Sequence, residues 1–133
     1  MRVGCLAVVV TILCGCSCNT MPQFSRSDLE NATFECYLNG ECERSMKWSG
    51  LPRHCREVLL KWTEVAPANA HSSLSTYAPV VVIRSKKMNV NFTMGLVVSN
   101  CEDANGKWKQ VVRNMNEQDE EVRDNIINAK QKK

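Results

Sequence analysis

The sequence lacks any apolar run of about 18 residues, the length that a membrane-spanning helix needs. It also lacks a glycine-rich phosphate loop, a site motif with paired carboxylates, and a Ser, His and Asp arrangement tied to a catalytic motif. Its two histidines, His54 and His71, stand apart, and no pair of its later cysteines has the spacing of a zinc site. These absences predict one soluble domain that is not an enzyme and holds no cofactor or metal.

The first residues follow the order of a secretory signal peptide. Arg2 precedes an apolar stretch from Val3 to Leu13, and small residues follow at positions 15–18. We therefore expect residues 1–18 to be a signal peptide and the mature protein to be secreted. The alternative is a bacterial lipobox, which would give a membrane-anchored product, at Leu13-Cys14-Gly15-Cys16.

Four cysteines remain beyond the signal peptide and the ambiguous Cys18. An even number in an oxidising compartment predicts two disulfides, and three pairings are open. Two N-glycosylation sequons, which begin at Asn31 and Asn91, agree with secretion and predict exposed loops. The four cysteines are Cys36, Cys42, Cys55 and Cys101.

The first part of the mature chain has no sustained period. Residues 19–35 are mostly polar and predict a flexible arm. The Asn39-Gly40 dipeptide predicts a turn. Residues 43–54 predict an irregular loop, because apolar residues stand among basic ones there with neither helical nor alternating spacing.

Three segments predict strands. Residues 56–65 are rich in β-formers, although Val58, Leu59 and Trp62 would also suit a short helix. The β-branched run at 79–83 and the apolar residues of 94–100 predict two further strands. The basic stretch from Arg84 to Lys87 predicts a turn between them.

A helix is expected from Asn105 onward. Its apolar stripe has the spacing i, i+3, i+4, i+7 at Trp108, Val111, Val112 and Met115. Residues 119–133 predict an extension of this helix followed by a charged tail. The acidic run from Asp119 to Glu121 is interpreted as a solvated helix face.

The order of these elements resembles a chemokine. In that family the third strand ends in a cysteine, an acidic turn follows, and the helix opens with Trp and Val. The matching residues are Cys101, Glu102, Asp103, Trp108, Val111 and Val112. The sequence departs from the family in the five residues between Cys36 and Cys42 and in the missing cysteine near positions 75–78.

The resemblance implies an α+β domain over residues 36–118. Its irregular N-loop would precede a three-stranded antiparallel sheet, and one C-terminal helix would cover that sheet. The resemblance also implies the disulfides Cys42 with Cys101 and Cys36 with Cys55.

The implied function is a secreted ligand of a seven-helix chemokine receptor on leukocytes, held on cell surfaces by sulfated glycosaminoglycan, with no nucleic-acid partner. Arg84, Lys86 and Lys87 would bind the glycosaminoglycan, since clustered cations attract a polyanion. One alternative is a diverged, virus-encoded chemokine-like protein that does not signal, either as a subunit of a glycoprotein assembly or as a receptor antagonist or decoy. A second alternative is a short helical cytokine. A homodimer or a disulfide-linked partner is also expected as an option. The loop expected to dock on the receptor contributes Arg44, Met46, Lys47, Trp48, Leu51, Arg53 and Arg56.

Overall fold

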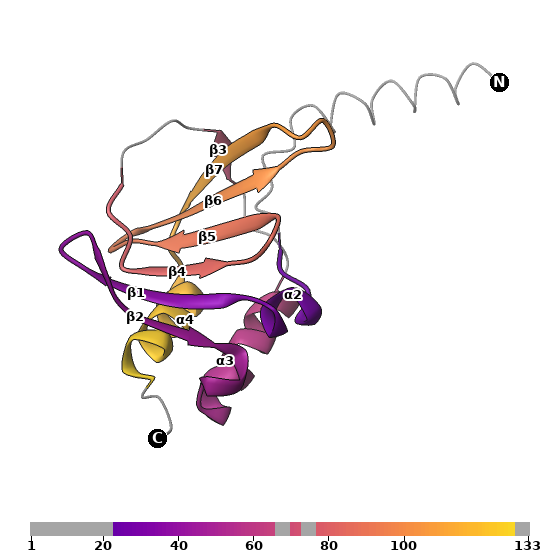
Figure 1. The fold of residues 1–133 in the computed structure, drawn as a ribbon. Helices are drawn as coiled ribbons and strands as arrows, with labels where there is room; N and C mark the ends of the chain where they lie inside the picture. Colours follow the sequence, from indigo (N-terminus) through magenta and orange to yellow (C-terminus); the bar gives the residue numbers. More distant parts are fainter. Residues whose placement is uncertain (1–22, 66–69, 73–76, 130–133) are drawn as a thin grey trace, which may run out of the picture.

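The computed structural model describes residues 23–65, 70–72 and 77–129, so the predicted signal peptide lies outside the described residues. These residues form an antiparallel sheet in the order β2-β1-β4-β5-β6-β7-β3, with helices gathered toward its β1–β2 end (Figure 1). The elements are α2 (Arg26–Glu30), β1 (Thr33–Leu38), β2 (Glu41–Lys47), η1 (Trp48–Gly50), α3 (Arg53–Glu64), β3 (His71–Ser72), β4 (Val81–Arg84), β5 (Met88–Phe92), β6 (Leu96–Glu102), β7 (Trp108–Asn114) and α4 (Glu117–Asn128).

The predicted three-stranded sheet under one helix is wrong. Six of the strands have four residues or more, and β3 adds two residues at one edge. The expected helix from Asn105 is the strand β7, and the expected strand at 56–65 lies almost wholly in α3. The strands β4 and β6 stand close to the predicted positions, and Arg84–Lys87 leads through the expected turn into β5.

The first Asn-Gly dipeptide forms the turn that the sequence predicts. Asn39 and Gly40 have φ values of 51° and 81°, and Leu38 stands opposite Glu41. Two central residues with positive φ give a turn whose twist matches that of paired strands. The loop expected at 43–54 therefore begins as strand β2.

A second Asn-Gly dipeptide explains why β7 is a strand. Gly106 has a φ of 80°, and the Asp103 N–H donates to the Lys107 carbonyl at 2.8 Å. This turn directs the chain back along β6, where Val111 and Val112 continue the ladder. Because β-branched side chains suit a pleated sheet, this pairing prevails over the helical spacing of the apolar stripe.

Helix α3 is amphipathic. Cys55, Val58 and Leu59 are buried and Trp62 is half-buried, so the spacing i, i+3, i+4, i+7 gives one apolar face. Pro52 precedes the first turn, a position that proline tolerates because the first helical N–H groups have no partner. The helical reading of these residues is therefore the one that the structure adopts.

Capping boxes fix the starts of α2 and α4. The Ser25 hydroxyl accepts from the Asp28 N–H at 3.1 Å, and the Asp28 carboxylate accepts from the Ser25 N–H at 2.8 Å. Asn116 and Asp119 form the same pair of bonds in α4. The described part of the expected flexible arm is thus ordered, and its Phe24 and Leu29 are buried in the core.

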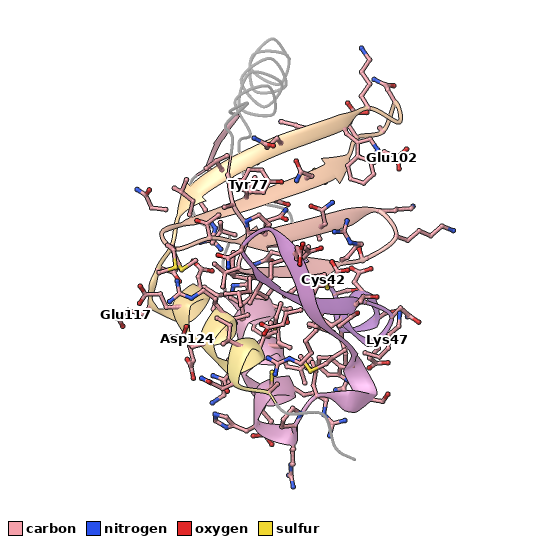
Figure 2. The ribbon with its side chains drawn as sticks, turned by 60° about the vertical axis from the view of Figure 1, so that its left-hand side comes forward. Cys42, Lys47, Tyr77, Glu102, Glu117 and Asp124 are labelled. Carbon is pink, nitrogen blue, oxygen red and sulfur yellow. The ribbon has the colours of Figure 1, made fainter. Side chains whose placement is uncertain are left out.

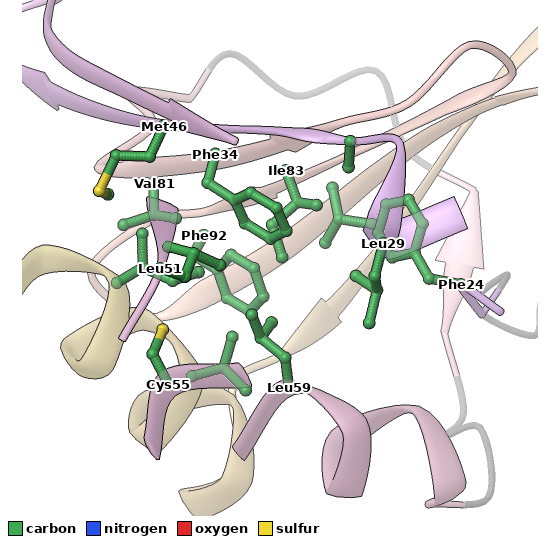
Figure 3. Packing of buried hydrophobic residues seen from close by; sticks show 14 of the residues in the cluster. Phe24, Leu29, Phe34, Met46, Leu51, Cys55, Leu59, Val81, Ile83 and Phe92 are labelled. Atoms are coloured by element: carbon green, nitrogen blue, oxygen red, sulfur yellow. The ribbon is translucent and has the colours of Figure 1, made fainter. Parts of the chain in front are cut away.

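The main core lies between one face of the sheet and the helices. Directly opposed residues share a face of a sheet. Phe34 therefore faces the same way as Ile83 and Val90. Figure 3 shows Phe34, Ile83 and Phe92 above Leu59 of α3. Among the described residues, no helix has the length and apolar character that crossing a membrane requires.

Candidate functional site

The residues predicted to dock on a receptor do not form one exposed surface. Met46 and Leu51 are 2% and 1% exposed, so both belong to the core. Trp48 is half-buried, and its ring centroid lies 6.3 Å from that of Phe34. Among the predicted anchors, the apolar ones therefore stabilise the fold rather than face a partner.

The cations of that predicted surface are also dispersed. Arg44 donates to the carbonyls of Ile126, at 3.3 Å, and Ile127, near the end of α4. The Ile126 carbonyl also accepts from the Ala129 N–H at 3.2 Å, so this guanidinium adds further hydrogen bonds to the carbonyls at the helix end. The other cations are Lys47, which donates to the Thr33 hydroxyl, Arg53, which pairs with Glu57, and the half-buried Arg56.

The four described cysteines are free thiols. Cys42 lies on β2 and Cys101 on β6, with β1, β4 and β5 between them. Four strand steps of about 4.8 Å separate them by about 19 Å, whereas a disulfide requires Cα atoms within about 7 Å. The predicted bridge between these two cysteines is therefore incompatible with the sheet. Cys36 and Cys55 are both buried in the core cluster.

The two sequons lie in different environments. Asn31 is exposed at the end of α2, although its amide donates to the Ser27 carbonyl at 2.9 Å. Asn91 lies within β5, is 5% exposed, and donates to the Asn89 side chain and the Val98 carbonyl at 2.8 and 3.2 Å. A glycan would replace one of the two hydrogens on this amide nitrogen, and with it one of these bonds. Because Asn91 is buried within a strand, the prediction of an exposed loop is wrong for Asn91.

The predicted basic turn stands beside a second one that the sequence analysis missed. The Glu102 N–H donates to the Lys87 carbonyl at 3.3 Å, which joins the β4–β5 turn to the end of β6. Trp108 stands opposite Glu102 in the β6–β7 hairpin. Four exposed lysines consequently gather at one end of the sheet. We call them the basic end: Lys86, Lys87, Lys107 and Lys109.

The electrostatics of the basic end favour anions. Within the described residues none of its lysines forms an ion pair, whereas Arg84 pairs with Glu35 at 3.1 Å. Two carboxylates, Glu102 and Asp103, stand nearby. Asp103 accepts from the backbone N–H groups of Asn105 and Lys107 at 2.8 and 3.0 Å, which holds the turn in shape. Four lysines against two carboxylates leave an excess of positive charge.

A row of amide side chains continues from the basic end along one face of the sheet. Asn89, Asn100 and Gln110 stand directly opposite one another on β5, β6 and β7, so they share a face. We call them the amide row. The Asn100 side-chain nitrogen donates to the Asn89 side-chain oxygen and to the Tyr77 hydroxyl, both at 3.0 Å. Figure 2 shows Tyr77 and Glu102 in the upper part of the sheet, away from the helices.

Trp108 is the one exposed aromatic residue of the described chain. Its side chain is 58% exposed, and it follows the Asp103–Lys107 turn. Strand alternation places it on the same face as Gln110 and therefore on the face of the amide row. Neither Trp108 nor the amide row was singled out as a ligand site by the sequence analysis. The Asn105-Gly106 turn signal could have placed Trp108 on a strand.

A groove lies between α3 and α4. This groove has a volume of about 150 Å³. The groove is lined by His54, Glu57, Val58, Lys61, Trp62, Gln118 and Glu121. In the described residues no three acidic, His or Cys side chains are placed to hold a metal.

A buried polar network underlies this groove. Asp119 is fully buried and accepts from Trp62 Nε1 at 2.9 Å and from Arg113 Nη2 at 2.7 Å. Burial alone would raise the pKa of Asp119, but hydrogen bonds from Arg113, the Asn116 N–H and Trp62 lower it overall. The prediction that Asp119 belongs to a solvated helix face is wrong. This network joins three elements, so its role is structural.

Comparison of the chain with protein-family models, curated proteins and solved structures found no match.

Proposed function

We propose that this protein is an extracellular binding protein, without catalytic activity, whose ligand is a sulfated glycosaminoglycan. The observation that carries the proposal is the junction of the two turns at the basic end. A polyanion laid across that end would meet Lys86 and Lys87 from the β4–β5 turn, Lys107 from the β6–β7 turn and Lys109 from the start of β7. Closely spaced cations displace counterions from a polyanion, which favours binding.

This proposal keeps one part of the function predicted from the sequence. The receptor-docking part depended on Met46 and Leu51 as surface anchors, and both are in the core. The glycosaminoglycan part depended on an exposed basic turn after the first β-branched strand, and that part requires no chemokine scaffold. The secretory signal predicted at residues 1–18 is consistent with an extracellular ligand.

The proposal is tested by salt-dependent binding to immobilised heparin. Two double variants, K86A/K87A and K107A/K109A, each remove two charges from one turn. The matched control R53A/K61A removes two exposed cations from α3. On nucleic acids each neutralised phosphate adds roughly 0.7 to 0.9 to the slope of log affinity against log salt. We expect a similar value per sulfate, so each lysine double variant should flatten the slope by roughly 1.4 to 1.8.

Two outcomes would contradict the proposal. One is an unmodified protein that does not bind heparin at about 0.15 M salt, where screening acts over about 8 Å. The other is a control variant that loses as much affinity as the lysine variants, because binding would then report net charge rather than a site.

A further inference from the structure

The largest exposed apolar group near the basic end is the indole of Trp108. Leu38 and Met94 are also exposed, but they stand in other turns of the sheet. Trp108 is held by a turn in which Asp103 accepts two backbone N–H groups and Gly106 takes a positive φ. A flat ring on a fixed backbone is preorganised for stacking, because little conformational freedom is lost on binding.

Two residues of the amide row, Asn89 and Asn100, have polar atoms that no described residue binds. Asn89 uses its carbonyl oxygen to accept from Asn91 and Asn100. Asn100 uses its amide nitrogen to donate to Asn89 and Tyr77. Within the described residues, Asn89 Nδ2 and Asn100 Oδ1 make no hydrogen bond, and both residues are half-buried. Among the described residues, one donor of Asn89 and one acceptor of Asn100 are therefore left without a partner.

Trp108 and this pair are within reach of one ligand. Asn100 is diagonal to Trp108 across the β6–β7 ladder, a relation that places Cα atoms about 7–8 Å apart. Asn89 is one strand further, and Lys87 stands just before β5. The face thus presents a stacking ring, then hydroxyl-binding amides, then cations.

We infer that this face recognises the sugar rings of the glycosaminoglycan, with Trp108 stacked on one ring and Asn89 and Asn100 bonded to hydroxyl groups. The inference rests on the proposed function, since the lysines supply the attraction for sulfates. Neutral amides with one open donor and one open acceptor match hydroxyl groups, which both donate and accept. Glu102, opposite Trp108, can accept from a hydroxyl group, which the sugar rings of a glycosaminoglycan carry and the backbone of single-stranded DNA lacks. A glycan is therefore favoured over single-stranded DNA, whose bases would also stack on the indole.

The test compares two polyanions by isothermal calorimetry: a heparin oligosaccharide, which has sugar rings, and inorganic polyphosphate, which has none. Trp108→Ala should lower the affinity for heparin by about tenfold, within the range for loss of one stacking aromatic on single-stranded nucleic acid. It should leave polyphosphate binding within about twofold, and Trp108→Phe should restore most of the heparin affinity, because the ring remains. The control is Leu38→Ala, which removes an equally exposed apolar side chain from another hairpin.

The outcomes separate this inference from the proposed function. Heparin affinity that is unchanged in Trp108→Ala but reduced in K86A/K87A would overturn the sugar-reading role and leave the basic end as the site. Equal losses for heparin and polyphosphate would also overturn it. Tighter binding of single-stranded DNA than of heparin, lost in Trp108→Ala, would identify a nucleic-acid site instead. Failure of both polyanions to bind the unmodified protein would overturn the proposed function itself.

Discussion

Replacement of Asp119 by alanine should destabilise the protein strongly, because it breaks a buried ion pair. The Asp119 carboxylate is fully buried and bonded to Arg113, Trp62 and the Asn116 N–H. Its loss leaves the guanidinium of Arg113, which is 7% exposed, without a counter-charge. Removing one partner of a buried ion pair costs about 3–5 kcal/mol, and loss of the bond from the Asn116 N–H adds about 1 kcal/mol.

Urea denaturation followed by circular dichroism measures this change. We expect the free energy of unfolding to fall by about 4–6 kcal/mol in Asp119→Ala, from the two terms above. Glu120→Ala removes an exposed neighbouring carboxylate and should change stability by less than about 0.5 kcal/mol. An exposed ion pair contributes at most about 1 kcal/mol. A loss of unfolding free energy below that value in Asp119→Ala would refute the structural role assigned to the buried network.

The pH dependence of stability tests independently whether the charged Asp119 carboxylate stabilises the folded state. The pKa of Asp119 is lowered in the folded protein, so the folded state favours the charged carboxylate. The stabilisation is present above the ordinary pKa of about 4 and is lost as pH falls through the lowered folded value. The unmodified protein should therefore lose more stability on acidification than Asp119→Ala does.

Three further predictions concern the thiols, the sequons and the core. Iodoacetamide at pH 8 should modify the exposed Cys42 quickly and Cys55 only on unfolding, because burial raises the pKa of Cys55 to about 11. A disulfide between Cys42 and Cys101, detected by peptide mapping, would contradict the sheet order. Expression in a glycosylating host should give a glycan at Asn31 alone, and a mass shift at Asn91 on enzymatic deglycosylation would show that β5 is misplaced. Leu59→Ala should cost about 2–5 kcal/mol of unfolding free energy, and a cost below about 1 kcal/mol would place Leu59 outside the core.

The sequence predicted those elements whose signal is local. The turn at Asn39 and Gly40 depends on residues that accept positive φ, and the run that becomes β4 depends on β-branching. The helix predicted over Trp108–Met115 was wrong because one spacing suits two structures. A stripe at i, i+3, i+4, i+7 is helical only if no partner strand is available, and the turn at Gly106 supplies that partner.

The candidate site was harder to predict than the strands. Lys86 and Lys87 stand out as a basic turn within one short segment, and they were identified. Asn89, Asn100 and Trp108 come together only through strand register, which residue spacing does not reveal. Asp119 was misread for the same reason, because its partners Trp62 and Arg113 lie on other elements.

The central claim is that a sulfated glycan binds across the basic end and the amide row, and heteronuclear NMR titration with a heparin hexasaccharide tests it most directly. The account predicts chemical-shift changes in residues 84–89 and 100–110, including the indole N–H of Trp108, with little change in α3 and α4. Shift changes confined to the groove between α3 and α4, or no change at saturating hexasaccharide, would contradict it.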